Sequence, residues 1–171
     1  DTTLGSSEGN AAAELYHRGA LSGYPEGTFA GYRKVDRAES LKILLKTRYS
    51  TVENLPNNNR FWDVNTGEWY VKYVMKAIKL GIVVGYYDGS FKPGKKVNTA
   101  EFLKMLSRTF ALANNLPYSY TDVPTSSWYA KYAGVAQKYN LFPNRTSQLL
   151  PRQSLTRSEV AIAVNQYLKN R

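Results

Sequence analysis

One seven-residue motif occurs twice in this 171-residue chain, and the distance between its two copies constrains the fold more than any other feature. Residues 23–29 read G-Y-P-E-G-T-F and residues 85–91 read G-Y-Y-D-G-S-F, an offset of 62. The same offset relates two further pairs of segments: Arg37-Ala38-Glu39 with Thr99-Ala100-Glu101, and Asp1 with Asp63. Self-similarity at a fixed period is the signature of repeated supersecondary units. The chain is therefore predicted to be an array of repeats.

A third copy follows at a slightly shorter step. Asp63 and Trp69 recur as Asp122 and Trp128 at an offset of 59, and Glu101 recurs as Glu159 at an offset of 58. We expect the copies to span 1–50, 61–112 and 120–171, with linkers rich in Asn and Pro between them. Because one small helix pair cannot bury its apolar face alone, the three copies are expected to pack into one body.

The middle copy shows the predicted unit most clearly. Apolar residues at helical spacing predict a helix from about Glu68 to Leu80, with Gly81 as its left-handed terminal residue. A glycine-punctuated loop follows over 82–91, and a second helix begins at Asn98. The predicted fold class is mainly α: three helix–loop–helix repeats forming a helical bundle.

The second helix of every copy carries the same start signal. A capping box is present in each: Asp36-x-x-Glu39, Asn98-x-x-Glu101 and Thr156-x-x-Glu159. The first side chain accepts a hydrogen bond from a backbone N–H, and the glutamate reaches back to the N–H of the cap. The three glutamates are therefore interpreted as helix caps and not as catalytic acids.

Composition narrows the class of partner. Lys and Arg outnumber Asp and Glu by 23 to 13, and the resulting formal charge of +10 favours an anionic partner. The absence of Cys excludes disulfides and thiolate metal sites, and no apolar run approaches the ~18 residues of a membrane span. The chain begins at Asp1 without Met or a signal-like segment, so we expect a processed or excised fragment.

The middle copy resembles the S-layer homology repeat. It contains F-x-D-V, a Trp after a short spacer, A-I-x-x-G-I-V-x-G-Y-x-D-G-S-F-x-P, and N-T-A-E at the place of the T-R-x-E box. The first copy has Ser7 in place of the Trp, and the third copy has Asn144–Leu150 in place of the glycine loop. The resemblance covers nearly the whole chain.

This resemblance implies a fold, a function and a location. Such modules form a pseudo-threefold bundle of three tandem repeats with the capped helices at the centre. They attach secreted bacterial proteins non-covalently to a secondary cell-wall polysaccharide, often one with anionic pyruvyl-ketal sugars. The implied location is the extracellular cell surface, cell wall or S-layer. The implied partners are that polysaccharide and other surface proteins, with no cofactor, no nucleic acid and no membrane insertion.

The resemblance also implies ligand grooves between repeats, near the box helices and the loop glycines. Free N–H groups at a helix start suit a carboxylate, an Arg can add a paired charge-assisted bond, and a Trp can pack on a sugar ring. Glycine lets the backbone approach a ligand closely. The carbohydrate-binding candidates are Gly23, Asp36, Arg37, Trp69, Gly85, Trp128 and Arg157.

Comparing the copies sharpens this hypothesis. Arg occupies the box at Arg37 and Arg157, but the middle copy has Thr99. If each groove pairs the Arg of one repeat with the Trp of the next, only the pair of Arg37 with Trp69 is intact. The first groove is then predicted to be the principal site.

Each candidate also has a structural interpretation. Trp69 and Trp128 suit core packing, the two arginines suit solvated first-turn positions, and the loop glycines and Asp88 suit the shape of the loop. A structural ion near Asp63 and Asp122 has no support beyond the two carboxylates. An enzyme is not expected, because His17 is the only His and the repeated carboxylates already have capping or turn roles.

The sequence is also compatible with two alternative functions. The 14 tyrosines and the basic charge suit a nucleic-acid-binding repeat, although no Lys/Arg stripe or nucleic-acid motif is present. A protein–protein or lattice-forming module that has lost sugar binding would account for the imperfect third loop and for Thr99.

Overall fold

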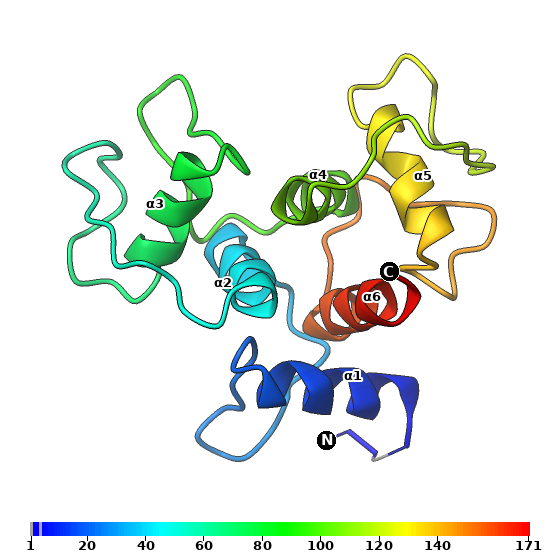
Figure 1. The fold of residues 1–171 in the computed structure, drawn as a ribbon, viewed down its shortest axis with the longest axis horizontal. Coiled ribbons are helices and arrows are strands. Elements are labelled where there is room, and N and C mark those ends of the chain that lie inside the picture. Colours follow the sequence, from blue (N-terminus) through cyan, green and yellow to red (C-terminus); the bar gives the residue numbers. More distant parts are fainter. Residues whose placement is uncertain (1, 4) are drawn as a thin grey trace.

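The computed structural model describes residues 2, 3 and 5–171, and within them the chain folds into six helices (Figure 1). In chain order these are α1 (Ser7–His17), α2 (Arg37–Arg48), α3 (Val71–Lys79), α4 (Thr99–Phe110), α5 (Ala130–Lys138) and α6 (Arg157–Asn170). The predicted mainly α class is confirmed. The predicted equivalence of Asp1 with Asp63 lies outside the described residues.

The helices α2, α4 and α6 form the centre of the molecule, and α1, α3 and α5 lie outside them (Figure 1). The central helices α2, α4 and α6 are the ones with capping boxes. Each outer helix packs on the central helix of the preceding repeat: α3 on α2, α5 on α4 and, closing the circle, α1 on α6. The first and third repeats therefore meet as directly as sequential repeats do.

A ring of three hydrogen bonds joins the segments that lead into the central helices. The N–H of Val35 donates to the carbonyl of Leu155 at 3.0 Å, that of Leu155 to Val97 at 3.1 Å, and that of Val97 to Val35 at 3.1 Å. All three side chains are fully buried. Because each segment is paired on both sides, the ring leaves no open edge at the centre.

All three predicted capping boxes are confirmed. Asp36, Asn98 and Thr156 accept from the backbone of the glutamate three residues on, and each glutamate accepts from the N–H of its cap. Ser6 caps α1 in a simpler way, by accepting from the N–H of Gly9. The boxes determine where the central helices begin and so align the three repeats.

The first N–H groups of the central helices are not free. In α2 the N–H of Arg37 donates to the carbonyl of Lys95 at 3.0 Å, and that of Ala38 donates to Pro93 at 3.1 Å. The equivalent groups of α4 and α6 donate to carbonyls of Gln153, Pro151, Arg33 and Gly31. The expectation that a ligand carboxylate meets free N–H groups here is wrong, since carbonyls of a neighbouring repeat use them.

The aspartates that open the second and third repeats hold their loops. The two carboxylate oxygens of Asp63 accept from the N–H groups of Phe91 and Lys92, both at 2.7 Å. Asp122 accepts in the same way from Leu149 and Leu150, both at 2.8 Å. This accounts for both carboxylates without an ion, and no cluster of metal-ligating side chains occurs among the residues described.

The helix expected from about Glu68 begins three residues later. Glu68 and Tyr70 form turns, and α3 starts at Val71 without a side-chain cap. Gly81 does end the helix in a left-handed conformation, with φ of 67°. In the described part of the chain, no helix combines the length and apolar character needed to cross a membrane.

Candidate functional site

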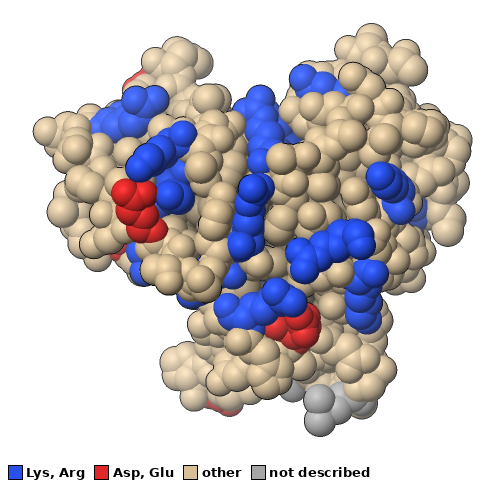
Figure 2. Space-filling view, viewed as in Figure 1, with Lys and Arg blue, Asp and Glu red and all other residues tan. Residues whose placement is uncertain are grey.

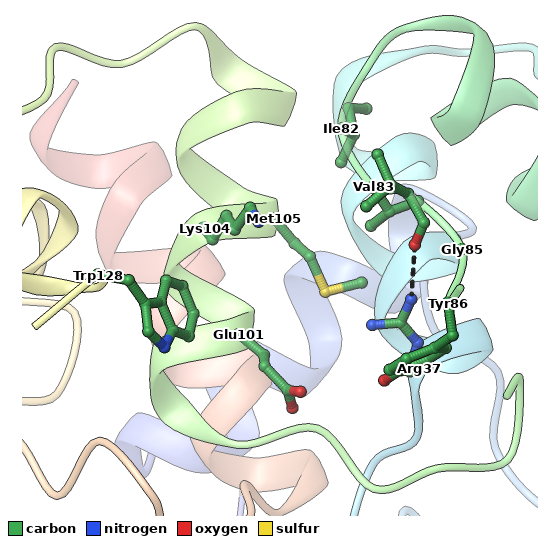
Figure 3. Close-up of a pocket in the computed structure, with 10 residues that line it drawn as sticks. Arg37, Ile82, Val83, Gly85, Tyr86, Glu101, Lys104, Met105 and Trp128 are labelled. Atoms are coloured by element: carbon green, nitrogen blue, oxygen red, sulfur yellow. Dashed lines mark hydrogen bonds between the residues drawn. The ribbon is translucent and has the colours of Figure 1, made fainter. Parts of the chain in front are cut away.

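Two grooves of the same design lie between repeats. The first, here the Arg37 groove, has a volume of about 220 Å³ and brings together the start of α2, the loop 82–86, one face of α4 and Trp128. Figure 3 shows Arg37 and Tyr86 on one side, with Glu101, Lys104 and Trp128 on the other. Three repeats thus contribute to a single groove.

The second groove, here the Arg157 groove, has a volume of about 110 Å³. Arg157 from the start of α6 faces the loop 20–22 of the first repeat, and Glu39 and Lys42 of α2 form the floor with Trp69 beside them. Each lining residue of functional interest has a counterpart in the Arg37 groove: Arg157 with Arg37, Glu39 with Glu101, Lys42 with Lys104, and Trp69 with Trp128.

The predicted pairing of Arg37 with Trp69 is wrong. The structure places Arg37 with Trp128, and Arg157 with Trp69. The reason is the circular packing, in which a central helix receives the Trp of the following repeat on one side and the Arg of the preceding repeat on the other. Two grooves therefore have both residues, where the sequence comparison predicted one.

The two arginines hold the glycine loops in place. Arg37 donates from Nε to the carbonyl of Phe91 at 3.1 Å and from Nη2 to that of Val84 at 3.3 Å. Arg157 donates to Phe29 and Ser22, both at 3.0 Å. Each residue is only 7% exposed. Since two donors of each guanidinium are engaged inside the protein, the arginines shape the groove wall and add positive charge there.

A lysine and a tryptophan form the more open part of each groove. The Nζ atom of Lys104 lies 5.5 Å from the ring centre of Trp128, and that of Lys42 lies 5.7 Å from Trp69. The indoles are half exposed, at 53% and 49%. The interpretation of these tryptophans as core residues is therefore wrong, and each presents a ring to solvent beside a cation.

The groove lysines are partly desolvated and lie near other cations. Burial lowers the pKa of Lys104, and the positive charges of Arg108, Lys131 and Arg37 lower it further. Burial also lowers the pKa of Lys42, with Arg157 and Lys46 acting in the same direction. A bound anion would raise the pKa of both lysines again, because it offsets the crowded positive charge.

The floor glutamates differ in their partners. In the Arg37 groove, Lys95 forms an ion pair with Glu101 at 2.9 Å and also donates to the hydroxyl of Tyr86 at 3.2 Å. In the Arg157 groove the counterpart of Lys95 is Arg33, which lies over the ring of Tyr24 at 4.8 Å. Lys95 thus pairs with the floor glutamate of its groove, whereas its counterpart Arg33 contacts a tyrosine ring.

The remaining sequence candidates lie outside the open grooves or have internal roles. Asp36 is the cap of α2, and its carboxylate lies 3.8 Å from Lys96. Gly23 lines a separate hollow of about 820 Å³ between α1 and the loop 23–29. Gly85 borders the Arg37 groove, but a Cβ there would lie 2.2 Å from the ring of Phe61. Close packing inside the repeat, and not ligand approach, accounts for this glycine.

The lysines are the site residues that the sequence comparison missed. Lys42 and Lys104 are related by the same offset of 62 that reveals the repeats, and the third repeat has Ile162 at the equivalent place. A residue-by-residue comparison of the central helices would therefore have found them.

Comparison with known proteins identifies the family. The S-layer homology domain matches this chain over three segments, residues 3–39, 60–103 and 119–161, which together cover most of the chain. The chain belongs to the S-layer homology domain family. The resemblance drawn from the repeated motifs is thereby confirmed, and the three matches correspond to three tandem S-layer homology repeats.

Several curated relatives are surface proteins by name. Cell surface glycoprotein 1 of Acetivibrio thermocellus is 28% identical over 65% of this chain and 5% of the relative, and the Cellulosome-anchoring protein of the same organism is 30% identical over 63% and 25%. S-layer protein EA1 of Bacillus anthracis is 26% identical over 86% of this chain and 17% of the relative. The chain spans a quarter or less of the length of these relatives.

The family and these relatives place the module at the extracellular cell surface or cell wall, where it serves in anchoring. S-layer homology repeats are themselves non-catalytic modules. Some relatives carry the name of an enzyme, such as the Amylopullulanase of Thermoanaerobacterium thermosulfurigenes, which is 28% identical over 78% of this chain but only 7% of its own length.

Proposed function

We propose that this module anchors its parent protein non-covalently to the cell wall by binding an anionic secondary polysaccharide in the Arg37 and Arg157 grooves. One observation carries the proposal: a guanidinium, an ammonium and an exposed indole occur together at two symmetry-related places. A pyruvyl ketal, which adds a carboxylate to a sugar ring, has the chemistry that this combination recognises.

Each group in a groove has a distinct part in such binding. The lysine ammonium pairs with the carboxylate, and its partial desolvation strengthens the pair. The indole packs on the apolar face of the sugar ring. The arginine holds the loop at the opposite wall and adds to the positive potential. Both grooves are smaller than the ~300 Å³ of ordinary small-molecule pockets, so each suits one ring of a chain.

The distribution of charge favours a wall polymer over nucleic acid. On the face of the molecule that Figure 2 shows, Lys and Arg occur as separate groups divided by uncharged surface, and not as one continuous stripe. A nucleic-acid groove tracks a backbone with closely spaced phosphates and needs such a stripe. Two separated cationic grooves instead suit a polymer that carries isolated carboxylates, and binding in both adds avidity.

Sedimentation with purified cell-wall sacculi tests the proposal. Wild type should sediment with intact sacculi and stay in solution after the attached polysaccharide is stripped. Lys42→Gln/Lys104→Gln should lose most of this binding, whereas Lys169→Gln, an exposed lysine at the end of α6, should bind as wild type does. Equal binding to intact and stripped sacculi would contradict the proposal and favour a protein or lattice contact. Salt-sensitive binding to DNA of the same strength would favour the nucleic-acid alternative.

A further inference from the structure

The third interface between repeats lacks all three groups that define the two grooves. Thr99 stands at the position of Arg37 and Arg157. Ile162 stands at the position of the groove lysines, and Ser7 at the position of the tryptophans. The start of α4 nevertheless contacts the segment before α6 here, because the N–H of Thr99 donates to the carbonyl of Gln153 and that of Ala100 to Pro151, both at 3.0 Å.

Another arginine reaches this interface from a different part of the chain. Arg145 lies in the third loop, where the sequence departs from the glycine motif of the other repeats. Its Nη1 atom donates to the carbonyl of Leu149 at 2.7 Å and to the hydroxyl of Thr99 at 2.8 Å. The guanidinium also lies over the ring of Phe142, 4.6 Å from its centre.

The carbonyl of Leu149 is the counterpart of those that Arg37 and Arg157 use. The N–H of Leu149 donates to Asp122, just as that of Phe91 donates to Asp63. Arg37 donates to the carbonyl of Phe91, and Arg157 to that of Phe29. Arg145 therefore binds the same loop carbonyl as the other two arginines, and its bond to Thr99 connects it to the position where the arginine is missing.

Unlike the other two, this guanidinium forms an ion pair with the floor glutamate. Nη2 of Arg145 lies 2.5 Å from the carboxylate of Glu159, and the Arg145 side chain is 8% exposed. Burial alone raises the pKa of Glu159, but hydrogen bonds from the Thr156 backbone and from Arg145 outweigh it and hold that pKa below its ordinary value. The pair is charge-neutral, so it presents no unpaired cation to a ligand.

We propose that Arg145 is a transposed interface arginine, which locks the second repeat to the third in place of an arginine at position 99. Because this interface also has no lysine and no tryptophan at the equivalent positions, and its one guanidinium is paired with Glu159, it presents no free cation to an anion, so the module has two binding grooves. The lock stands on the contacts of Arg145 alone. The number of grooves rests on the proposed function.

Thermal unfolding tests the lock without any ligand. Arg145→Ala leaves Glu159 partly buried without its partner, so the melting temperature should fall by on the order of 10 °C. Arg152→Ala, an exposed arginine nearby in the chain, should shift it by no more than about 2 °C. Returning the guanidinium to its usual position, in Arg145→Ala/Thr99→Arg, should recover at least half of the loss. An unchanged melting temperature in Arg145→Ala, or no recovery in the double variant, would overturn the lock.

A second readout separates an ion pair from mere packing. In carbon-13 NMR titrations the carboxyl of Glu159 should titrate at higher pH in Arg145→Ala than in wild type. An identical titration would show that Arg145 acts on this interface through contact area alone and would overturn the paired arrangement.

Calorimetry with a monovalent probe tests the number of grooves. The probe is a synthetic methyl hexoside that carries one pyruvyl ketal, and its methyl ester is the uncharged control. Wild type and Arg145→Ala/Thr99→Arg should each bind two probes, and Arg37 and Arg157 groove variants should account for both. A third site in wild type would overturn the closed interface. If no variant binds the probe, the proposed function fails together with the number of grooves, whereas the melting temperatures still decide the lock.

Discussion

The ammonium of Lys104 lies 5.5 Å from the indole centre of Trp128, although the two residues belong to different repeats. The lysine is on the central helix α4 and the tryptophan precedes α5, which packs on α4. The same relation joins Lys42 with Trp69 at 5.7 Å. The packing of the outer helices thus places a lysine beside a half-exposed indole in both grooves. Because each groove has its own lysine and tryptophan, one groove can be disabled by mutation without changing the other.

Removing one indole should disable one groove and leave the other intact. For Trp128→Ala, we expect the number of pyruvylated probes bound in calorimetry to fall from two to one, or the affinity of one site to fall about tenfold or more. Retention on intact sacculi should fall by ~10²-fold, because avidity is lost. The ring is half exposed, so the melting temperature should change little.

Trp62→Ala is the matched control for this experiment. Trp62 is 71% exposed, lies outside both grooves and donates to the carbonyl of Asp88 at 3.1 Å. Its loss should leave both stoichiometry and wall retention unchanged. Equal losses in the two variants would contradict the assignment of the groove to Trp128.

A methyl group at Gly85 should destabilise the fold through the core of the second repeat. A Cβ there would lie 2.2 Å from the Phe61 ring and 3.0 Å from the carbonyl of Ser90, so the ring must move. Gly85→Ala should therefore lower the free energy of unfolding by about 1–3 kcal/mol. Gly94→Ala is the control, because a Cβ at Gly94 meets nothing within 4 Å and should change this free energy by less than about 0.5 kcal/mol. Urea denaturation measures both.

The charge of the Asp36 cap should cost stability at neutral pH. Burial raises the pKa of Asp36, whereas a backbone hydrogen bond from Glu39 lowers it in part. A carboxyl whose pKa is raised by folding contributes stability below its unfolded value of ~3.9, and that contribution is lost as pH rises through the folded value. Asp36→Asn keeps the capping oxygen, as Asn98 does naturally in the second repeat. We expect this variant to be more stable than wild type at pH 7 and to lose that advantage below about pH 4.

Denaturation at a series of pH values checks this prediction, with Asp36→Ala as the comparison. Alanine removes the cap itself, so it should lower the free energy of unfolding by about 1 kcal/mol at either pH. An Asp36→Asn variant that is less stable than wild type at pH 7 would mean that the contact with Lys96, 3.8 Å away, outweighs the cost of burial.

The fold was predictable from the sequence because its causes are local. Capping boxes start α2, α4 and α6, and the recurrent spacing shows that three like units must share a core. The site was predictable only in part. Arg37, Arg157, Trp69 and Trp128 do line grooves, but their partners depend on the circular order of packing, which linear spacing does not reveal.

The other failures have equally specific causes. The first N–H groups of α2 are bound by carbonyls of Lys95 and Pro93, a tertiary contact with no local signature. Arg145 is in the loop where the third repeat no longer follows the motif, so comparing equivalent positions could not find an arginine that had moved to a different position in the chain.

Binding of an anionic sugar should weaken in alkaline solution because of the groove lysines. Burial lowers the pKa of Lys42 and of Lys104, and neighbouring cations add to this effect. A bound carboxylate favours the ammonium form and so raises both pKa values. Affinity is therefore fully present at neutral pH and is lost as pH rises through the pKa of the free lysines. This loss begins below the ordinary lysine pKa of ~10.4.

The variant Lys42→Arg/Lys104→Arg should hold its affinity to higher pH, because a guanidinium stays protonated throughout this range. Calorimetric titration of the pyruvylated probe between about pH 7 and 10 measures the effect, with circular dichroism confirming that the fold persists. Parallel declines in wild type and the arginine variant would assign the loss to the tyrosines or to the fold and would remove the lysines from the binding site.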